Sequence, residues 1–499
     1  MQEASFNGQK MAPGEGIGST ADASEEKLSD SDEIVVEKVK LKRSITFFGV
    51  IAILIANIGQ TSIFITPTMI LRFTGSPGMS IIIWMLGGIM QAFIAFCAVE
   101  VALMLNKAGG PYYFIYYTFG DMAGFAFMWG YVIFVSGPTW ALGAYTTSLY
   151  TLSAFYTGCE PPDFLVKLVA LWLMVSLIAL NCTHMKLITS IQSVLTSSKL
   201  IALTVIITIG LVLVPSDTGQ ENLRSFMDES TNGIGNIALA LFTGFFGFGG
   251  WQVITILAEE VKDPVRNIPR GILLSFIVII AVMMATNFAY YVVLSKEEAL
   301  ESDAVAMLFG RMVHPILPLV ISVLVSLCSI GTLNVLIMGQ PRLLFAAGRN
   351  GHMPRIMTML HKKYHTPWPA TWTMGATATC MLAMGSVVSL VAAISLFAGI
   401  MTLSLVLCLL FLRWKQPKMH RPLKIPIAIP IVVTALMVII LSVSIYKEPA
   451  ALIFNLVIIS LGLPIYILVF KCEAVKKRLT FMDRVGFYLE KLFSLQYET

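Results

Sequence analysis

One stretch of the chain combines an apolar composition with closely spaced glycines, a pattern that could build a binding site. Residues 241–260 read LFTGFFGFGGWQVITILAEE and carry Gly244, Gly247, Gly249 and Gly250 within about two helical turns. Glycine disfavours helix by about 1 kcal/mol relative to alanine, so the cluster predicts a helix break. Half-helix ends at such a break can bind a substrate carboxylate inside a membrane. The alternative is that these glycines only allow two helices to pack closely.

A second interruption lies near the start of the chain. Residues 58–63 read IGQTSI and place polar side chains within an otherwise apolar segment, which is costly unless they face a cavity. Interruptions at matching positions of two halves are the best sequence indicator of a binding site. The candidate substrate-binding residues are Gln60, Thr61, Ser62, Ile63, Phe246, Gly247, Phe248 and Gly249.

Lys199 is the most informative ionisable residue inside an apolar segment. It follows the hydroxyl residues Thr196, Ser197 and Ser198. An ammonium within a bilayer needs a partner, such as the carbonyl groups at a helix break. We expect Lys199 to be a fixed cation near the site, and the alternative is a lysine that snorkels to the interface.

The elements that position these residues follow from composition. The chain has 499 residues, of which 57% are hydrophobic and only 13% are charged, whereas a soluble domain has roughly twice that share of charge. The pattern predicts an all-α polytopic membrane protein. It gives no sign of a nucleic-acid partner, a cofactor, a metal site or a nucleophile–base set typical of an enzyme.

Twelve apolar segments of spanning length predict twelve transmembrane helices. They are residues 45–71, 80–105, 122–156, 164–181, 187–215, 233–258, 268–294, 316–339, 371–385, 386–412, 425–446 and 450–470. The two interruptions fall in the first and sixth segments, which indicates a five-plus-five inverted repeat with two extra helices.

The predicted organisation is a polar, disordered cytoplasmic tail, a transporter domain of twelve spans and a second cytoplasmic tail. The tail and domain bounds are 1–40, 41–471 and 472–499, with repeat one at about 45–215, repeat two at about 233–412 and the extra helices at about 425–470. The last tail has the helical spacing of either an amphipathic helix on the cytoplasmic leaflet or an ordinary solvated helix.

Loop charges predict the orientation. Two loops carry basic residues without acids: Arg342, Arg349, Arg355, Lys362 and Lys363, then Arg413, Lys415, Lys418, Arg421 and Lys424. Two alternate loops are acidic: Asp217, Glu221, Asp228 and Glu229, then Glu297, Glu298, Glu301 and Asp303. Basic loops remain cytoplasmic, and an even number of spans places both termini on that side.

Ordered motifs carry a family resemblance. The motifs are SIFITP, TGSPG, NKAGGPYY, GCEPP, FFGFGGW, EEVKDPVRNIP, PRLLFAAGRNGHMP, HTPWPA and MHRPLKIP. In this set and order the chain resembles the light-chain subunits of heteromeric amino-acid transporters, the L-type branch of the amino acid–polyamine–organocation superfamily. The resemblance implies a LeuT-like fold, sodium-independent exchange of amino acids and a plasma-membrane location.

The resemblance also implies roles for single residues. Phe246 matches a gating aromatic that closes over the substrate, and Lys199 matches a lysine that stands where sodium-coupled relatives bind a cation. Cys159 matches the external cysteine that joins the light chain to a single-pass glycoprotein heavy chain by a disulfide. The alternative for Cys159 is a free surface thiol.

Several positions depart from the family. Its first break has a Gly-Ser-Gly type motif, where this chain has Gln60-Thr61-Ser62, so hydroxyl groups replace bare amides or Gln60 obstructs the site. Gly137 stands where the family often has a basic residue. Ala398 stands where acidic-substrate exchangers have arginine, and Gly399 replaces a bulky aromatic. We therefore expect neutral substrates.

Two other functions stay open at this point. A non-transporting amino-acid sensor or regulatory subunit would keep the fold and Cys159 but lose turnover through the altered first break. A carrier of organic cations or polyamines is disfavoured, because the apolar segments lack unpaired acids.

Overall fold

A computed structural model describes most of the chain after residue 44. The described residues are 45–59, 62–105, 109–156, 161–183, 185–231, 233–258, 261–301, 305–364, 366–385, 387–447, 449–468, 490–491 and 494–497. Within them, eight helical segments are long and apolar enough to cross a membrane. This confirms the predicted helical class, while the count of twelve spans stays a prediction. The predicted tail over residues 1–40 lies outside the described residues.

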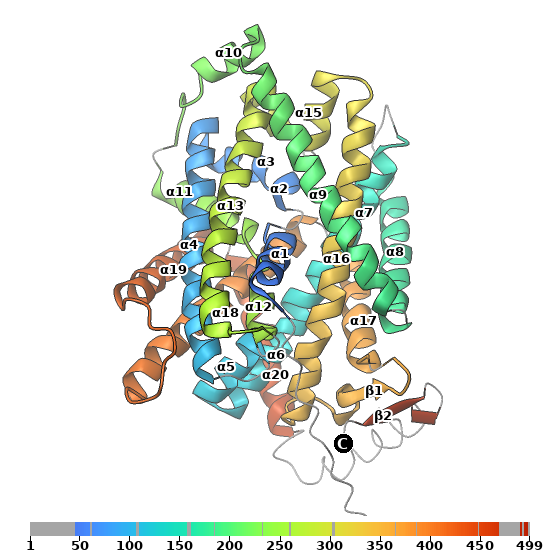
Figure 1. Cartoon of the computed structure of the whole chain (residues 1–499), viewed down its shortest axis with the longest axis vertical. Helices are drawn as coiled ribbons and strands as arrows, with labels where there is room; N and C mark the ends of the chain where they lie inside the picture. Colours follow the sequence, from blue (N-terminus) through green and yellow to red (C-terminus); the bar gives the residue numbers. More distant parts are fainter. Residues whose placement is uncertain are drawn as a thin grey trace, which may run out of the picture. The chain divides into compact units, whose positions relative to one another are not determined.

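The first half of the chain forms helices interrupted near its start and in its third apolar segment (Figure 1). The elements are α1 (Phe47–Asn57), α2 (Ser62–Ile65), α3 (Pro67–Thr74), α4 (Pro77–Leu105), α5 (Gly110–Phe119), α6 (Asp121–Gly130), the π-helical turn η1 (Tyr131–Ser136), α7 (Gly137–Ser153), α8 (Asp163–Thr183) and α9 (Met185–Leu213). The π turn η1 ends two residues before Pro138, which lacks the amide that an α-helix needs. Helix α5 was not predicted.

The second half repeats the theme of an interrupted first helix. Its elements are α10 (Asp217–Arg224), α11 (Ile234–Gly247), α12 (Gln252–Ile256), α13 (Pro264–Val293), α14 (Lys296–Glu301), α15 (Val305–Val313), α16 (Leu317–Arg349), the 3-10 turn η3 (Arg355–Thr358), β1 (Met359–His361), α17 (Trp368–Met384) and α18 (Val387–Lys415). After these come α19 (Ala428–Lys447), α20 (Pro449–Tyr466) and β2 (Leu495–Tyr497).

The end of the C-terminal tail forms a strand, where we expected helix. Strand β2 pairs antiparallel with β1, with Leu360 opposite Gln496. Leu495 is buried there with Ile356 and Met359 in a small apolar cluster. This pairing depends on a loop far away in sequence, which helical spacing within the tail cannot reveal.

Buried apolar side chains form two large clusters. One joins α1, α3, α4, α11 and α13, and the other joins α5, α7, α8, α17 and the second half of α16. The short helices α10 and α15 lie toward one end of the long helices, whereas α5, β1 and β2 lie toward the other (Figure 1). The acidic and the basic loops therefore lie at opposite ends.

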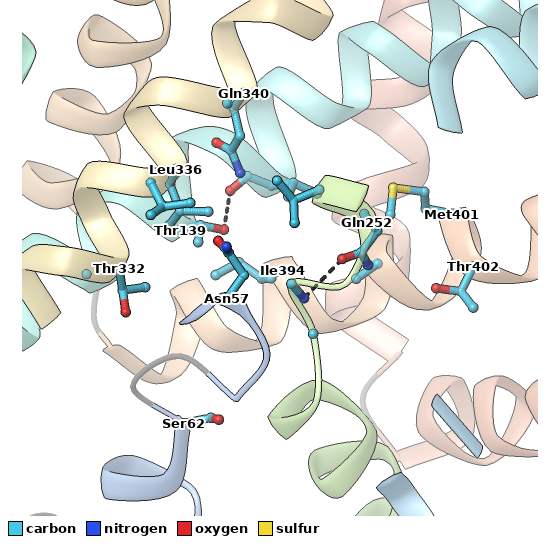
Figure 2. Close-up of a pocket in the computed structure, with 18 of the residues that line it drawn as sticks. Asn57, Ser62, Thr139, Gln252, Thr332, Leu336, Gln340, Ile394, Met401 and Thr402 are labelled. Atoms are coloured by element: carbon cyan, nitrogen blue, oxygen red, sulfur yellow. Dashed lines mark hydrogen bonds between the residues drawn. The ribbon is translucent and has the colours of Figure 1, made fainter. Parts of the chain in front are cut away.

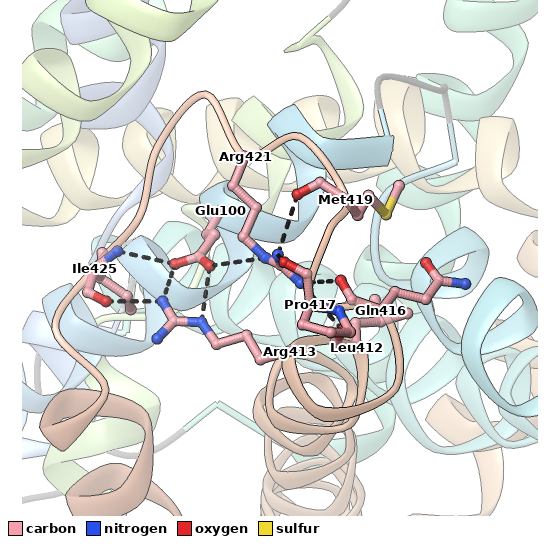
Figure 3. A network of polar contacts seen from close by, with 8 residues as sticks. All are labelled: Glu100, Leu412, Arg413, Gln416, Pro417, Met419, Arg421 and Ile425. Carbon is pink, nitrogen blue, oxygen red and sulfur yellow. Dashed lines mark hydrogen bonds and ion pairs between the residues drawn. The ribbon is translucent and has the colours of Figure 1, made fainter.

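A buried ion-pair network joins the ends of α4 and α18. Glu100 is fully buried and accepts hydrogen bonds from Nε of Arg413 at 2.9 Å and from its Nη2 (Figure 3). The Ile425 amide donates to the same carboxylate at 3.0 Å, and Nε of Arg421 lies 3.9 Å from it. A buried carboxylate is tolerated because these partners neutralise it.

A second polar cluster joins α5, α6 and the loop after α16. The hydroxyl of Tyr112 lies 2.6 Å from Nδ1 of His352, and Nε2 of His352 lies 3.2 Å from Asp121. Nδ2 of Asn350 donates to the Tyr112 hydroxyl at 3.2 Å. Burial lowers the pKa of His352 below its ordinary value of 6.5, and Asp121 opposes that shift.

We expect Glu100→Gln to destabilise the protein strongly, because it leaves two buried guanidinium groups without a counter-charge. The expected cost is about 3 to 5 kcal/mol, measured as a lower midpoint of thermal unfolding in detergent. The control is Glu221→Gln, which changes an exposed acid on α10. Equal midpoints for both variants would contradict the role of Glu100.

We expect a pH dependence from His352. Its lowered pKa means that the folded state disfavours the protonated ring, so this contribution to stability is present above about pH 6.5 and is lost as the pH falls below that value. The thermal unfolding midpoint of the wild type should decrease as the pH is lowered from about 7.5 to about 5.5. The midpoint of the His352→Gln variant should decrease less over that interval. The midpoint of the control variant His314→Gln, which changes an exposed residue, should decrease as much as that of the wild type. Identical pH slopes in all three proteins would refute this assignment.

Candidate functional site

The first interruption is a true break in the helix. Helix α1 ends at Asn57, and Ile58 adopts an extended conformation with ψ 140°. Gly59 has φ +74°, and a Cβ there would lie 2.0 Å from Cε of Met283. The left-handed conformation favours glycine at this position, whereas the flexible end of Met283 could move away from a Cβ.

The second interruption separates α11 from α12. Gly250 has φ +107°, which favours glycine. Gln91, from α4, donates from Nε2 to the carbonyl of Phe245 at 2.8 Å and accepts at Oε1 from Trp251 Nε1 at 2.8 Å. One buried amide side chain therefore satisfies backbone and side-chain groups on both sides of the break.

The two interruptions contact each other directly. The amide of Gly59 donates to the carbonyl of Gly249 at 3.3 Å. The hydroxyl of Ser62 lies 2.8 Å from the carbonyl oxygen of Gly59 and 2.9 Å from that of Gly247, so it donates to either break. Segments about 190 residues apart in sequence thus form one local structure.

Lys199 lies behind the first break. Its Nζ donates to the carbonyl oxygens of Ile58 at 2.7 Å and Ile55 at 3.4 Å, and the residue is only 5% exposed. These carbonyls belong to the C-terminal end of α1, where the helix dipole favours a cation. The geometry therefore fits the predicted fixed cation at a helix break.

A cavity of about 190 Å³ lies between the breaks and the helices η1, α7, α16 and α18. Figure 2 shows Thr332, Leu336 and Gln340 on one side of it and Gln252 and Thr402 on the other. The hydrogen-bonding side chains that line it are Asn57, Ser62, Thr66, Gln91, Tyr131, Thr139, Gln252, Thr332, Gln340 and Thr402.

The lining can form hydrogen bonds but carries no fixed charge. Among the lining residues that the structure describes, none is Asp, Glu, Lys, Arg or His. A charged side chain placed here would lose its hydration without gaining a counter-ion. Backbone groups of the two breaks lie beside this cavity, where a ligand's polar ends can reach them.

Four of the predicted site residues line the cavity: Ser62, Gly247, Gly249 and Ala398. Ile63 and Phe248 are fully buried beside the breaks instead. Phe248 packs edge-to-face on Trp84, with ring centroids 5.7 Å apart.

Gly137 and Gly399 are not among the residues that line this cavity, and their role in shaping it stays a prediction. A Cβ at Gly399 would lie 2.8 Å from Cδ2 of Leu441, on α19. A Cβ at Gly137 would lie 3.4 Å from Thr377, on α17. The approach of α19 is close at Gly399, whereas a Cβ at Gly137 would make only an ordinary van der Waals contact. Gln60, Thr61 and Cys159 lie outside the described residues, as does the side chain of Phe246.

The sequence interpretation missed most of the side chains that line the cavity. Helix α16 presents Thr332, Leu336, Gly339, Gln340 and Leu343 to it, at the spacing of one helical face. Polar residues recurring on one face of an apolar segment were the signal that could have identified this wall. Gln91 is a similar polar residue within a long apolar helix.

Comparison with known proteins places the chain in a family. The model of the family described as Amino acid permease matches residues 45–470. Asc-type amino acid transporter 1 of Mus musculus is 33% identical over 435 residues, covering 87% of this chain and 82% of the relative. Large neutral amino acids transporter small subunit 2 of Homo sapiens is 31% identical over 468 residues, covering 93% and 85%. Cystine/glutamate transporter of Homo sapiens is 31% identical over 437 residues, covering 87% and 86%. These matches confirm the resemblance to light chains of heteromeric transporters, and they show that the chain belongs to the amino acid permease family and is a permease, not an enzyme.

Proposed function

We propose that the protein is a sodium-independent exchanger of neutral L-amino acids at the plasma membrane, acting as the light chain of a heterodimer. The observation that carries the proposal is the cavity between two mutually bonded helix breaks, lined by uncharged hydrogen-bonding groups. The names of the relatives agree with amino acids as the cargo.

The substrate is held by its two charged ends. Its carboxylate meets backbone amides around residues 61–63 of the first break, and its ammonium meets carbonyl groups of residues 246–249 in the second. Ser62 supports this placement, because its hydroxyl lies within reach of both breaks. The absence of a charged group among the described lining residues favours a substrate with a neutral side chain.

Lys199 supports independence from sodium. Its ammonium already occupies the carbonyl groups at the end of α1, which would otherwise be ligands for a cation. A donor supplied by the protein removes the need for a bound ion at these carbonyl groups.

The architecture in this proposal is a LeuT-like arrangement of twelve spans with both termini cytoplasmic. The breaks fall in the first and sixth apolar segments, as an inverted repeat of five helices requires. The two large apolar clusters offer two units that rock against each other around the cavity. The acidic and basic loops lie at opposite ends, in agreement with basic loops on the cytoplasmic side.

A test of transport is radiolabelled amino-acid uptake in oocytes that also express a heavy chain. We expect that unlabelled neutral amino acids inhibit the uptake and that glutamate and lysine do not. The uptake should be unchanged when choline replaces sodium. Phe246→Ala, at the proposed gate, should lower uptake about tenfold, equivalent to about 1.4 kcal/mol. The control is Phe93→Ala, an exposed aromatic on α4.

Two results would count against this function. Full uptake by the Phe246→Ala variant would contradict the proposed gating role of Phe246. A heterodimer that reaches the surface but transports none of the amino acids would favour the alternative of a sensor.

We further propose that Cys159 forms the disulfide to the heavy chain. The pair should migrate as one band on a non-reducing gel and as two bands after reduction. Cys159→Ser should abolish the joint band, whereas Cys380→Ser, which changes an exposed cysteine on α17, should leave it intact. A joint band that persists in Cys159→Ser would overturn the assignment.

A further inference from the structure

Three amide side chains from three helices form a hydrogen-bonded chain within the apolar interior. Asn181 of α8 donates from Nδ2 to Oδ1 of Asn334 of α16 at 2.8 Å. Asn334 donates from Nδ2 to Oε1 of Gln192 of α9 at 2.6 Å. Gln192 donates from Nε2 to the carbonyl of Gly331, back on α16, at 3.3 Å.

Two members of this amide chain are enclosed, and Gln192 is partly buried. Asn334 is fully buried, and Asn181 is 4% exposed. At Gly331 the helices α9 and α16 come so close that a Cβ would lie 2.8 Å from that of Leu195. Buried amides without partners are costly, so the three residues hold one another in a fixed geometry.

The amide chain lies on the helix that carries the cation of the first break. Gln192 and Lys199 are seven residues apart on α9, about two turns, and therefore share a face. Lys199 donates to the carbonyl oxygens of Ile55 and Ile58. On α16, Asn334 stands between Thr332 and the cavity-lining Leu336. The amides thus join the support of the break to a wall of the cavity without lining the cavity themselves.

We propose that Asn181, Asn334 and Gln192 are positioning residues that fix α9 so that Lys199 stays on the carbonyls of the first break. The inference rests on the proposed transport function and adds the control of turnover to it. Because the amides do not line the cavity, their loss changes the transport rate and leaves the apparent substrate affinity unaltered.

The first experiment uses transport kinetics per protein at the cell surface. Gln192→Leu and Asn334→Leu should each lower Vmax about three- to tenfold at an unchanged KM, and the double variant should be no worse than the stronger single variant. The Gln192→Asn variant should also transport slowly, because its shorter side chain no longer reaches Asn334. Adding Asn334→Gln should restore the rate, since the pair regains its combined length. The control is Thr379→Val, which removes a partly buried hydroxyl that donates to the carbonyl of Gly375 within α17.

The second experiment does not need transport. The thermal unfolding midpoints of Gln192→Leu, Lys199→Met and their combination form a double-mutant cycle. We expect the combined drop to be smaller than the sum of the single drops, whereas Thr379→Val combined with Lys199→Met should be additive. Additive drops for the first pair, or an unchanged Vmax in Gln192→Leu, would overturn the inference. A wild type without transport, but with coupled midpoints, would refute the proposed function alone.

Discussion

A backbone group released by a helix break inside a membrane must find a partner within the protein, and this constraint governs the site. The carbonyls at the end of α1 bind the Lys199 ammonium. The carbonyl of Phe245 binds Gln91, and those of Gly59 and Gly247 share the Ser62 hydroxyl. Each break is therefore stable only when other helices bring these partners to it.

The same constraint explains where charge is allowed. Glu100 is buried, but it lies at the ends of α4 and α18, where Arg413 and Arg421 neutralise it. Lys199 is buried behind the first break, where it donates to carbonyl oxygens at the end of α1. Both charges are satisfied outside the cavity, so the described lining of the cavity is neutral while still rich in amides and hydroxyls. Selection among ligands then depends on which polar groups can be paired after dehydration.

Packing divides the buried side chains into two large clusters, and the cavity is lined from both. Phe245 and Met69 belong to elements of the first cluster, whereas Tyr131 and Leu343 belong to the second. Glycine allows a close approach between helices, as at Gly331 beside Leu195. A cavity at the boundary of two packed units can change shape when the units move, without disrupting either core.

The sequence by itself determined the helical membrane class, the two interruptions and the presence of a lysine inside an apolar segment, because these follow from local composition: apolar length, glycine clusters and a charge where hydration is absent. Only the tertiary structure decided which side chains complete the site. Gly399 and Gly137 lie against neighbouring helices, whereas Gln340 and Thr332, which the sequence analysis did not single out, line the cavity. The strand β2 likewise depends on pairing with a distant loop. Helix periodicity defines which residues share a face, but the neighbour that each face meets is set by packing between segments far apart in the chain.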